Sequence, residues 1–594
     1  MATYDDVTPE LDTPEPSPIH EKTPLIVQGQ DADDETEKIF FKSKAARFRV
    51  IFCILVIELC ERLTYYSISA NLVLFCTSEL NLTSAQAVTV SLVFTGTSYL
   101  FPIFGGFVAD SISGKFNAIY GSALAYFIGA ALLPVVAIDF MNLTDSAYEL
   151  TVVQKRFFYF IALLLVSIGT GGIKSNVGPF GAQQAEDLGR DAVQTFFNWF
   201  YWFINIGSAV SFSVVAYVQQ EISFVYGYLI PTISILFAII LLLAGRNSYI
   251  NRPPQGSAYS RVFKIVGQST KGITAKSETC DVVNSCLDRA KTSHGGSYTD
   301  AHVEEVKLLG RIIPIFLTII PYWTIYFQMQ STYFLQGEVL RLNVEDFVIP
   351  ISALNLFNIV IILVLIPVMD RCVYPLIKKC GVNFTPLRRI GFGMILATIS
   401  ITIAGITEIY RKNVMQGGGY FQQEINDVSY NSSNLTIFVQ IPQFALVGAS
   451  EVFTSITGLE FAFSQSPASM QGVVMGMFLL TSGLGSYLGS LLVAIVNSAS
   501  EDNPWIPDDV NCGYLERFFF LLAAILSVDF MIFVILAVKY KYVDPEEQIK
   551  FTEISEDCQP KQGVAAKTIE STAPPVREPG FTTVTDMKSE DTSV

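Results

Sequence analysis

The stretch FRVIFCILVIELCERLTYYSISANLVLF, Phe48 to Phe75, decides the fold class of this chain. Its apolar residues extend beyond the roughly 20 that are needed to span about 30 Å of hydrocarbon. Its middle nevertheless holds Glu58, Glu61 and Arg62, and on an insertion scale each charge at the bilayer centre costs roughly 2.5 to 3.5 kcal/mol. We interpret the stretch as a transmembrane helix whose charges serve a function.

The composition is that of a membrane protein with many spans. Of the 594 residues, 51% are hydrophobic and only 15% are charged, and the apolar residues gather in blocks of about 20. The net charge of −16 comes largely from two acidic ends, residues 1–46 and 542–594, which we interpret as disordered cytosolic tails. The nine cysteines lack metal-ligand spacing. We expect no enzyme activity, no cofactor, no metal site and no nucleic-acid partner.

Hydropathy predicts an all-α membrane protein with twelve transmembrane helices in two six-helix bundles. The first bundle covers residues 47–245 and the second covers residues 307–541, and the polar residues 246–306 form a cytosolic linker between them. This is the hydropathy of the major facilitator fold. The predicted spans are 47–77, 86–109, 117–140, 156–178, 195–217, 224–245, 308–335, 346–369, 388–407, 437–463, 470–497 and 515–540.

Charged loops and sequons predict the same orientation. Lysines and arginines concentrate in the loops on the side of the two chain ends, so the positive-inside rule places both ends in the cytosol. The glycosylation candidates Asn81, Asn142, Asn431 and Asn434 then fall on the far side, and only the sequon at Asn383 falls on the cytosolic side.

The segment GGFVADSISGKF resembles the signature loop of the major facilitator superfamily between the second and third helices. Its motif residues are Gly106, Asp110, Gly114 and Lys115. The glycines permit a tight turn and a close approach of helices, and Asp110 can accept a hydrogen bond from a helix N-terminus or pair with a basic residue. We interpret these as gate and fold residues.

The charges of the first span lie on one helix face, because Glu58, Glu61, Arg62 and Tyr65 are spaced at i, i+3, i+4 and i+7. That face must contact protein or a water-filled cavity. One interpretation is a buried ion pair that locks two helices together; the other is a functional site. Further polar groups in the middle of other spans favour the second.

Those further groups lie in five of the other predicted spans. Lys174 stands in a glycine-rich helix, SIGTGGIKSNVGPFGA, where a buried ammonium requires an anion. Glu451 is alone among small residues in GASEVFTSITGLEF, whereas Glu460 lies nearer the end of that span and suits a structural role. The remaining candidates are Asn205, Tyr322, Trp323 and Asn358.

The segments ELCERLTYY, FFNWFYWFINIG, SHGGSYT with VEEVK, IPYWTIYFQMQSTY and GLEFAFSQSPASM together resemble the proton-coupled oligopeptide transporter family. Within it the chain is most similar to the peptide/histidine transporter branch of solute carrier family 15. The resemblance runs from about Arg47 to Tyr542. It implies a symporter that moves histidine, dipeptides and tripeptides with protons by alternating access.

The resemblance also implies roles for the candidate residues. Glu58, Glu61 and Arg62 would couple protons to transport, Arg62 and Lys174 would hold the substrate carboxylate, and Glu451 would bind its amino group. Pocket-shaping roles fall on Tyr99, Asn205, Tyr322, Trp323 and Asn358.

The sequence departs from intestinal-type peptide carriers at three positions. Leu92 replaces the histidine of their second helix, and all three histidines of this chain lie outside the spans. Ser69 and Phe327 replace an arginine and an acid that form an outer-gate salt bridge. We therefore expect carboxylates to carry the protons and the outer-gate salt bridge to be absent.

The segment EKTPLI resembles a dileucine signal that cytosolic sorting adaptors read, with Glu21, Leu25 and Ile26 as its elements. We therefore expect an endosomal or lysosomal membrane, with the plasma membrane as the alternative, and transport towards the cytosol. A difference of two pH units supplies about 2.7 kcal/mol per proton. The rival functions are a carrier of another small solute, such as nitrate, and a membrane scaffold or signalling protein with the same fold.

Overall fold

A computed structural model describes residues 44–138, 150–254, 256, 258–274, 285–381, 384–426, 428–467, 470–500 and 502–542, which belong to one compact unit. The sorting signal at Glu21, Leu25 and Ile26, the sequons at Asn142 and Asn383, and most of both predicted tails lie outside these residues.

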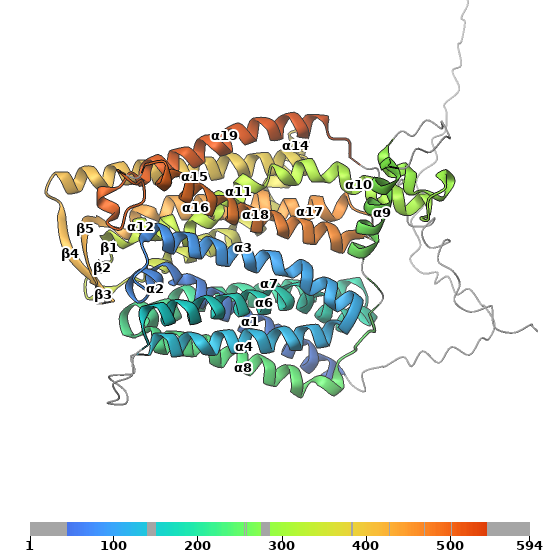
Figure 1. Ribbon diagram of the computed structural model, residues 1–594, viewed down its shortest axis with the longest axis horizontal. Coiled ribbons are helices and arrows are strands. Elements are labelled where there is room, and N and C mark those ends of the chain that lie inside the picture. The colour runs from blue at the N-terminus through green and yellow to red at the C-terminus, as the bar shows by residue number, and fades with distance from the viewer. Residues whose placement is uncertain are drawn as a thin grey trace, which may run out of the picture. The chain divides into compact units, whose positions relative to one another are not determined.

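Helices lie over all six predicted spans of the first bundle (Figure 1). The first helix begins at Lys44, earlier than the predicted residue 47. The elements are α1 (Lys44–Ala70), α2 (Leu72–Ser78), α3 (Ser84–Val108), η1 (Ala109–Ser113), α4 (Lys115–Ala137), α6 (Val152–Ala185), η2 (Glu186–Leu188), α7 (Arg190–Val210), η3 (Ser211–Val215), η4 (Val218–Ile222) and α8 (Phe224–Ala244).

Helices also lie over the six predicted spans of the second bundle. They are α10 (Asp300–Leu317), α11 (Ile320–Tyr326), η8 (Phe327–Gln330), α12 (Thr332–Glu338), η9 (Ile351–Leu354), α13 (Asn355–Val368), η10 (Met369–Val373), α14 (Tyr374–Lys379), α15 (Pro386–Gln416), η11 (Ile437–Gln440), α16 (Ile441–Glu451), η12 (Val452–Ile456), α17 (Thr457–Ser464), α18 (Gln471–Ser498) and α19 (Leu515–Lys539).

Two helix starts show how local sequence sets the boundaries. Thr83 before α3 and Thr151 before α6 each accept a hydrogen bond from the backbone of a glutamine three residues later, and that glutamine accepts one from the threonine backbone. These capping boxes satisfy backbone N–H groups that would otherwise lack partners at a helix start. They fix where both spans begin.

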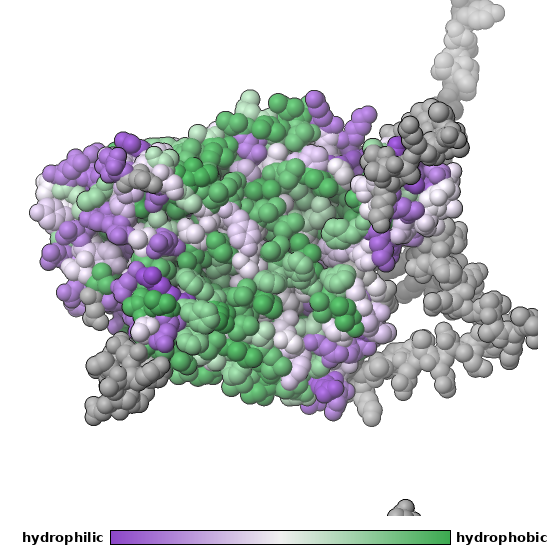
Figure 2. All heavy atoms as spheres, viewed as in Figure 1, coloured by the Kyte–Doolittle hydropathy of each residue, from purple (hydrophilic) through white to green (hydrophobic). Residues whose placement is uncertain are grey.

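The described helices are those of a multi-pass membrane protein. Ten of them are long and apolar enough to cross a membrane, and the bent pair Asp300–Leu317 and Ile320–Glu338, with a 43° bend, makes an eleventh. The helix α1 falls outside that set because it carries Glu58, Glu61 and Arg62. Figure 2 shows hydrophobic residues over the helical middle of one face and hydrophilic residues at its two ends.

Short strands interrupt the predicted all-helical fold at one end of the bundles, which we call the strand end (Figure 1). There β1 (Leu340–Arg341) pairs in parallel with β5 (Val428–Thr436), and β5 pairs antiparallel with β4 (Tyr420–Ile425). The strands β2 (Asn343–Val344) and β3 (Phe347–Val348) form a separate hairpin.

Three of the four glycosylation candidates fall within the described residues. Asn431 and Asn434 lie on β5, and Asn81 lies between α2 and α3. All three are exposed.

The opposite end, which we call the linker end, holds the connection between the bundles. This connection contains α9 (Ala258–Thr274) and two short 3-10 segments, η6 (Cys286–Ala290) and η7 (Thr292–His294). Lys291 and Lys307 each lie within 2.9 Å of both Asp288 and Glu304. Burial opposes ionisation of Asp288, but hydrogen bonds from Lys307 and Lys291 outweigh it and lower the pKa of Asp288 to about 2. These pairs fasten the second half of the linker to α10.

In the signature loop, the turn at Gly114 agrees with the prediction, but the close contact between α3 and α6 is made by a different glycine from the one predicted. Gly114 has φ of 75°, a conformation that favours glycine. A Cβ atom at Gly106 would meet Ser175 at an ordinary 3.9 Å, whereas one at Gly105 would lie 2.6 Å from Gly172 Cα. The close approach of α3 to α6 therefore depends on Gly105, and the prediction for Gly106 is wrong on this point.

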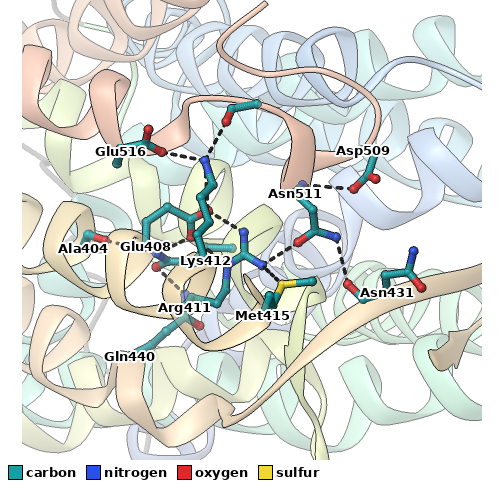
Figure 3. Close-up of polar contacts among 12 residues, drawn as sticks. Ala404, Glu408, Arg411, Lys412, Met415, Asn431, Gln440, Asp509, Asn511 and Glu516 are labelled. Atoms are coloured by element: carbon teal, nitrogen blue, oxygen red, sulfur yellow. Dashed lines mark hydrogen bonds and ion pairs between the residues drawn. The ribbon is translucent and has the colours of Figure 1, made fainter. Parts of the chain in front are cut away.

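A buried ion pair that the sequence analysis did not predict lies near the strand end of α15 (Figure 3). Glu408 and Arg411 are both inaccessible to solvent, and Arg411 reaches the carboxylate with Nη2 at 2.6 Å and Nε at 3.0 Å. Gln336 donates to the same carboxylate, and Arg411 also donates to Asn511. The two charges are thus compensated within the protein.

We predict that Glu408→Gln strongly destabilises the fold. The substitution leaves the Arg411 charge buried without its counter-charge, which costs about 3–5 kcal/mol. The midpoint of thermal unfolding in detergent should fall accordingly. The matched control is Glu460→Gln, since Glu460 is 55% exposed and lies 3.4 Å from Arg389, where a pair contributes about 0–1 kcal/mol. Equal midpoints for the two variants would contradict the prediction.

Candidate functional site

The three charges of α1 form one buried cluster. Glu58, Glu61 and Arg62 are at most 3% exposed. Arg62 Nε lies 3.0 Å from Glu58 Oε1, one helical turn away, and Arg62 Nη2 pairs with Glu61 Oε2. Thr170 of α6 donates a hydrogen bond to the other oxygen of Glu61. One guanidinium therefore holds two carboxylates at mid-helix.

Close packing of α7 on α1 supports this cluster. A Cβ atom at Gly207 would lie 2.8 Å from Leu59 O and 3.1 Å from Arg62 Cβ. Only glycine permits this approach without displacement of one helix. The arginine is thus held against α7 as well as against its two carboxylates.

Lys174 of α6 completes the charges of the first bundle. Its Nζ lies 3.6 Å from the centre of the Tyr99 ring and 5.4 Å from that of Tyr65, as in a cation–π contact. It also interacts electrostatically with both glutamates and with Arg62. The formal charges of Glu58, Glu61, Arg62 and Lys174 sum to zero.

In the second bundle, Glu451 ends α16 at the point where the π-helical turn η12 begins. Such turns are frequent at functional sites. Tyr326 and Asn358 interact with its carboxylate, but Glu451 Oε2 has no hydrogen-bond partner among the described residues. The hydroxyl of Tyr322 lies 3.3 Å from that of the adjacent Ser450.

Tyrosines connect the charges of the two bundles. Tyr66 and Tyr99 lie near both Arg62 and Glu451. Tyr201, Tyr322 and Tyr326 also interact with Glu451. The structure thus brings the cations of the first bundle and the acid of the second to one group of tyrosines. Such rings supply an apolar surface together with a few hydroxyl groups that can form hydrogen bonds.

Two predicted pocket residues contact neighbouring residues of the site. Asn205 is buried and donates to the carbonyl of Tyr201 in its own helix. Trp323 packs against Tyr326, Phe327 and Phe478. Both therefore position groups around the site.

Four contributors were missed by the sequence analysis. They are Tyr66, Thr170, Tyr201 and Tyr326, as their contacts with Arg62, Glu61 and Glu451 show. Each lies four residues from a predicted site residue, namely Arg62, Lys174, Asn205 and Tyr322. Residues four apart share a helix face, so extension of each candidate by one turn would have found them.

Hydrogen bonds join the bundles at the strand end, and one of them runs from the backbone N–H of Ser84 to Asp508 Oδ1 at 3.3 Å. Ser352 of η9 donates to Ala70 O at 2.5 Å, and the backbone N–H of Ile351 donates to Gln220 Oε1 at 3.1 Å. The rings of Tyr217 and Phe347 stack nearby, with centroids 5.4 Å apart.

At the positions where an outer-gate salt bridge was expected to be absent, Ser69 donates to a backbone carbonyl of its own helix. Phe327 packs on Tyr99 of the other bundle. The contacts at both positions are thus uncharged.

At the linker end, two motif residues line a cavity of about 310 Å³. Asp110 and Lys115 share it with Tyr259 and Gly472. The N–H of Gly256 donates to Asp110 O, and the Tyr259 hydroxyl donates to Gly472 O at 3.2 Å. The start of the linker therefore runs from the signature loop of the first bundle to α18 of the second.

These features are those of a major facilitator-type membrane protein with a polar centre between its two bundles. Comparison with known proteins gives the family. Residues 116–508 match the model of the POT family. The chain therefore belongs to the POT family.

Curated relatives match over most of the chain. It is 33% identical to mouse solute carrier family 15 member 3 over 90% of this chain and 97% of that protein. It is 31% identical to protein NRT1/PTR family 8.1 of Arabidopsis thaliana over 84% of this chain and 95% of the relative.

A solved structure of an auto-inhibited POT family peptide transporter is similar in fold. The TM-score is 0.68 at 25% identity, and the match covers 84% of this chain and 98% of the other.

Proposed function

We propose that this protein is a proton-coupled symporter that moves histidine, dipeptides and tripeptides across an endolysosomal membrane towards the cytosol. The observation that carries the proposal is that Arg62, Lys174 and Glu451 lie around the same tyrosines, Tyr66 and Tyr99. A zwitterion has the complementary charges, since its carboxylate suits the cations and its ammonium suits the acid.

Proton coupling follows from the arrangement of charges on α1. Burial disfavours an ionised carboxylate and a neighbouring cation favours it. Arg62 pairs with both Glu58 and Glu61. A substrate carboxylate that engages Arg62 would weaken those pairs, so one glutamate would take up a proton to stay buried. Release of substrate would reverse the exchange.

Alternating access is supported by the unequal ends of the bundles. Hydrogen bonds join the bundles directly at the strand end, through Ser352 and Ile351. A bound zwitterion would draw the two halves together at the centre, and rocking about that centre would open one end as the other closes.

The primary test is uptake of labelled histidine and of a labelled dipeptide into proteoliposomes, with and without an inward proton gradient. Gradient-driven uptake that each unlabelled substrate suppresses would support the proposal. Nitrate as a competitor tests the rival solute class. Folded protein that takes up neither label would overturn the proposal and favour a scaffold or signalling role.

In that assay we expect Glu61→Gln to abolish proton-driven accumulation and to leave some exchange of substrate for substrate. Gln cannot release a proton but keeps the size and the hydrogen-bonding oxygen that faces Thr170. The matched control is Glu305→Gln, which changes a buried glutamate of α10, near the linker end. Full accumulation by the Glu61 variant would remove this residue from the coupling step.

For Glu451→Gln we expect weaker binding of every substrate that has a free amino group. A charge-assisted hydrogen bond is roughly twice as strong as a neutral one, so the loss should be about tenfold or more in apparent affinity, which corresponds to about 1.4 kcal/mol. Competition by a peptide with an acetylated amino group should change little. An equal loss for both competitors would show a structural effect instead.

The proposed location rests on the tail segment with Glu21, Leu25 and Ile26. We expect replacement of Leu25 and Ile26 by alanine to shift the protein from endolysosomes to the plasma membrane. Replacement of the adjacent Val27 and Gln28 by alanine is the control. Imaging that finds both variants in the same compartment as the natural protein would exclude this segment as the signal.

A further inference from the structure

A further buried carboxyl group lies at the strand end, away from the central site. Glu338 is the last residue of α12 and is 2% exposed. Its Oε1 atom has no hydrogen-bond partner among the described residues. No charged side chain within those residues interacts with it electrostatically. Glu338 thus differs from Glu58, Glu61 and Glu408, each of which has a guanidinium partner.

The groups around Glu338 are neutral. Gln423 of β4 and Ser432 of β5 donate to its backbone carbonyl, each at 3.4 Å, and leave its carboxyl group free. Tyr430 of β5 is the titratable side chain that interacts with that carboxyl group. The nearest charged residues along the chain are exposed to solvent: Arg341, Glu345 and Asp346.

Glu338 stands directly behind the contacts that close the strand end. A Cβ atom on the adjacent Gly337 would lie 2.7 Å from Ile351 Cγ2, and the N–H of Ile351 donates to Gln220 of the first bundle. Tyr430 also lies beside Thr77 of α2, again in the first bundle. Separation of the bundles at this end would therefore expose Glu338 to water.

From this geometry we propose that Glu338 is a proton-binding site of the strand-end gate, neutral while that end is closed and ionised when it opens. The proposal rests on the proposed proton-coupled transport and adds a titrating residue outside the central site. The contacts next to Glu338, at Ser352, Ile351 and Gln220, are made by groups that do not titrate, whereas Asp508 accepts a hydrogen bond from Ser84 elsewhere at this end. A carboxyl group next to the contacts at Ser352 and Ile351 gives the closure a dependence on the pH of that compartment.

The direction follows from desolvation. An ionised carboxylate that is buried without a partner is strongly unfavourable, so the closed state requires the protonated acid. The open state gives the carboxylate water and favours ionisation. Low pH on the strand side should therefore close that end, and high pH should open it, with one proton released per opening.

The test measures the distance across the gate as a function of pH. Spin labels at Ile222→Cys and Val344→Cys report it, because both residues are exposed and lie in η4 and β2 of different bundles. The full chain is used, reconstituted in lipid, in a background free of other cysteines. For one proton the open-to-closed ratio changes at most about tenfold per pH unit.

We expect Glu338→Gln to hold the closed distance from pH 5 to pH 8. In a plot of the logarithm of the open-to-closed ratio against pH, the slope should fall by up to one per pH unit. Glu338→Met is the second variant, in case the amide impairs folding, and it should behave in the same way. Glu345→Gln, an exposed glutamate in the hairpin, is the control and should keep the natural pH dependence.

A natural slope in both Glu338 variants would overturn the proposal and leave this residue as a permanently protonated packing group. The measurement needs no substrate, so it separates this proposal from the proposed transport. A pH-dependent distance that requires Glu338, in protein that takes up no histidine or dipeptide, would support the proton site while overturning the symporter.

Discussion

The pairing of Arg62 with Glu58 and Glu61 is the interaction on which the rest of this structure depends. In a hydrocarbon environment a lone charge is costly, and only partners make it tolerable. One arginine cannot neutralise two carboxylates, so Lys174 completes a cluster with no net formal charge. Such a cluster is stable while it is undisturbed, but the charge state of each member depends on the charges of the other three. In the proposed mechanism, a ligand that engages one cation would alter the protonation of an acid.

The cost of unpaired charges in the membrane also explains why the centre of the protein and its strand end differ in their contacts. The centre holds charges that balance one another, whereas the gate at Ser352 and Ile351 is held by neutral hydrogen bonds. Ser69 and Phe327 also make uncharged contacts. The contacts at Ser352 and Ile351 can therefore open without leaving an unpaired ion on each side.

Hydropathy was sufficient to predict where the helical spans lie, because length and apolar composition are local properties. The candidate site residues came instead from polar groups in the middle of spans and from the family resemblance. Hydropathy did not predict the features that depend on tertiary contacts. The predicted span 388–407 stops before Glu408, but α15 continues to Gln416, so the buried pair of Glu408 and Arg411 lies beyond the predicted span. The close contact of α3 with α6 was assigned to Gly106 instead of Gly105, since only the packed structure shows which glycine faces its neighbour.

Three buried acids, Glu408, Glu451 and Glu338, differ in the partners of their carboxyl groups. Glu408 is held in place by a bidentate arginine and has no free oxygen for a ligand. Glu451 and Glu338 each keep an oxygen that has no partner among the described residues. Glu451 faces tyrosines of both bundles at the centre, so an ammonium group can meet it there. Glu338 lies behind a closed gate among neutral groups, where burial is compatible only with a proton. Under the roles proposed above, the same chemical group would serve as a structural anchor, a substrate contact or a proton acceptor, according to what the fold places beside it.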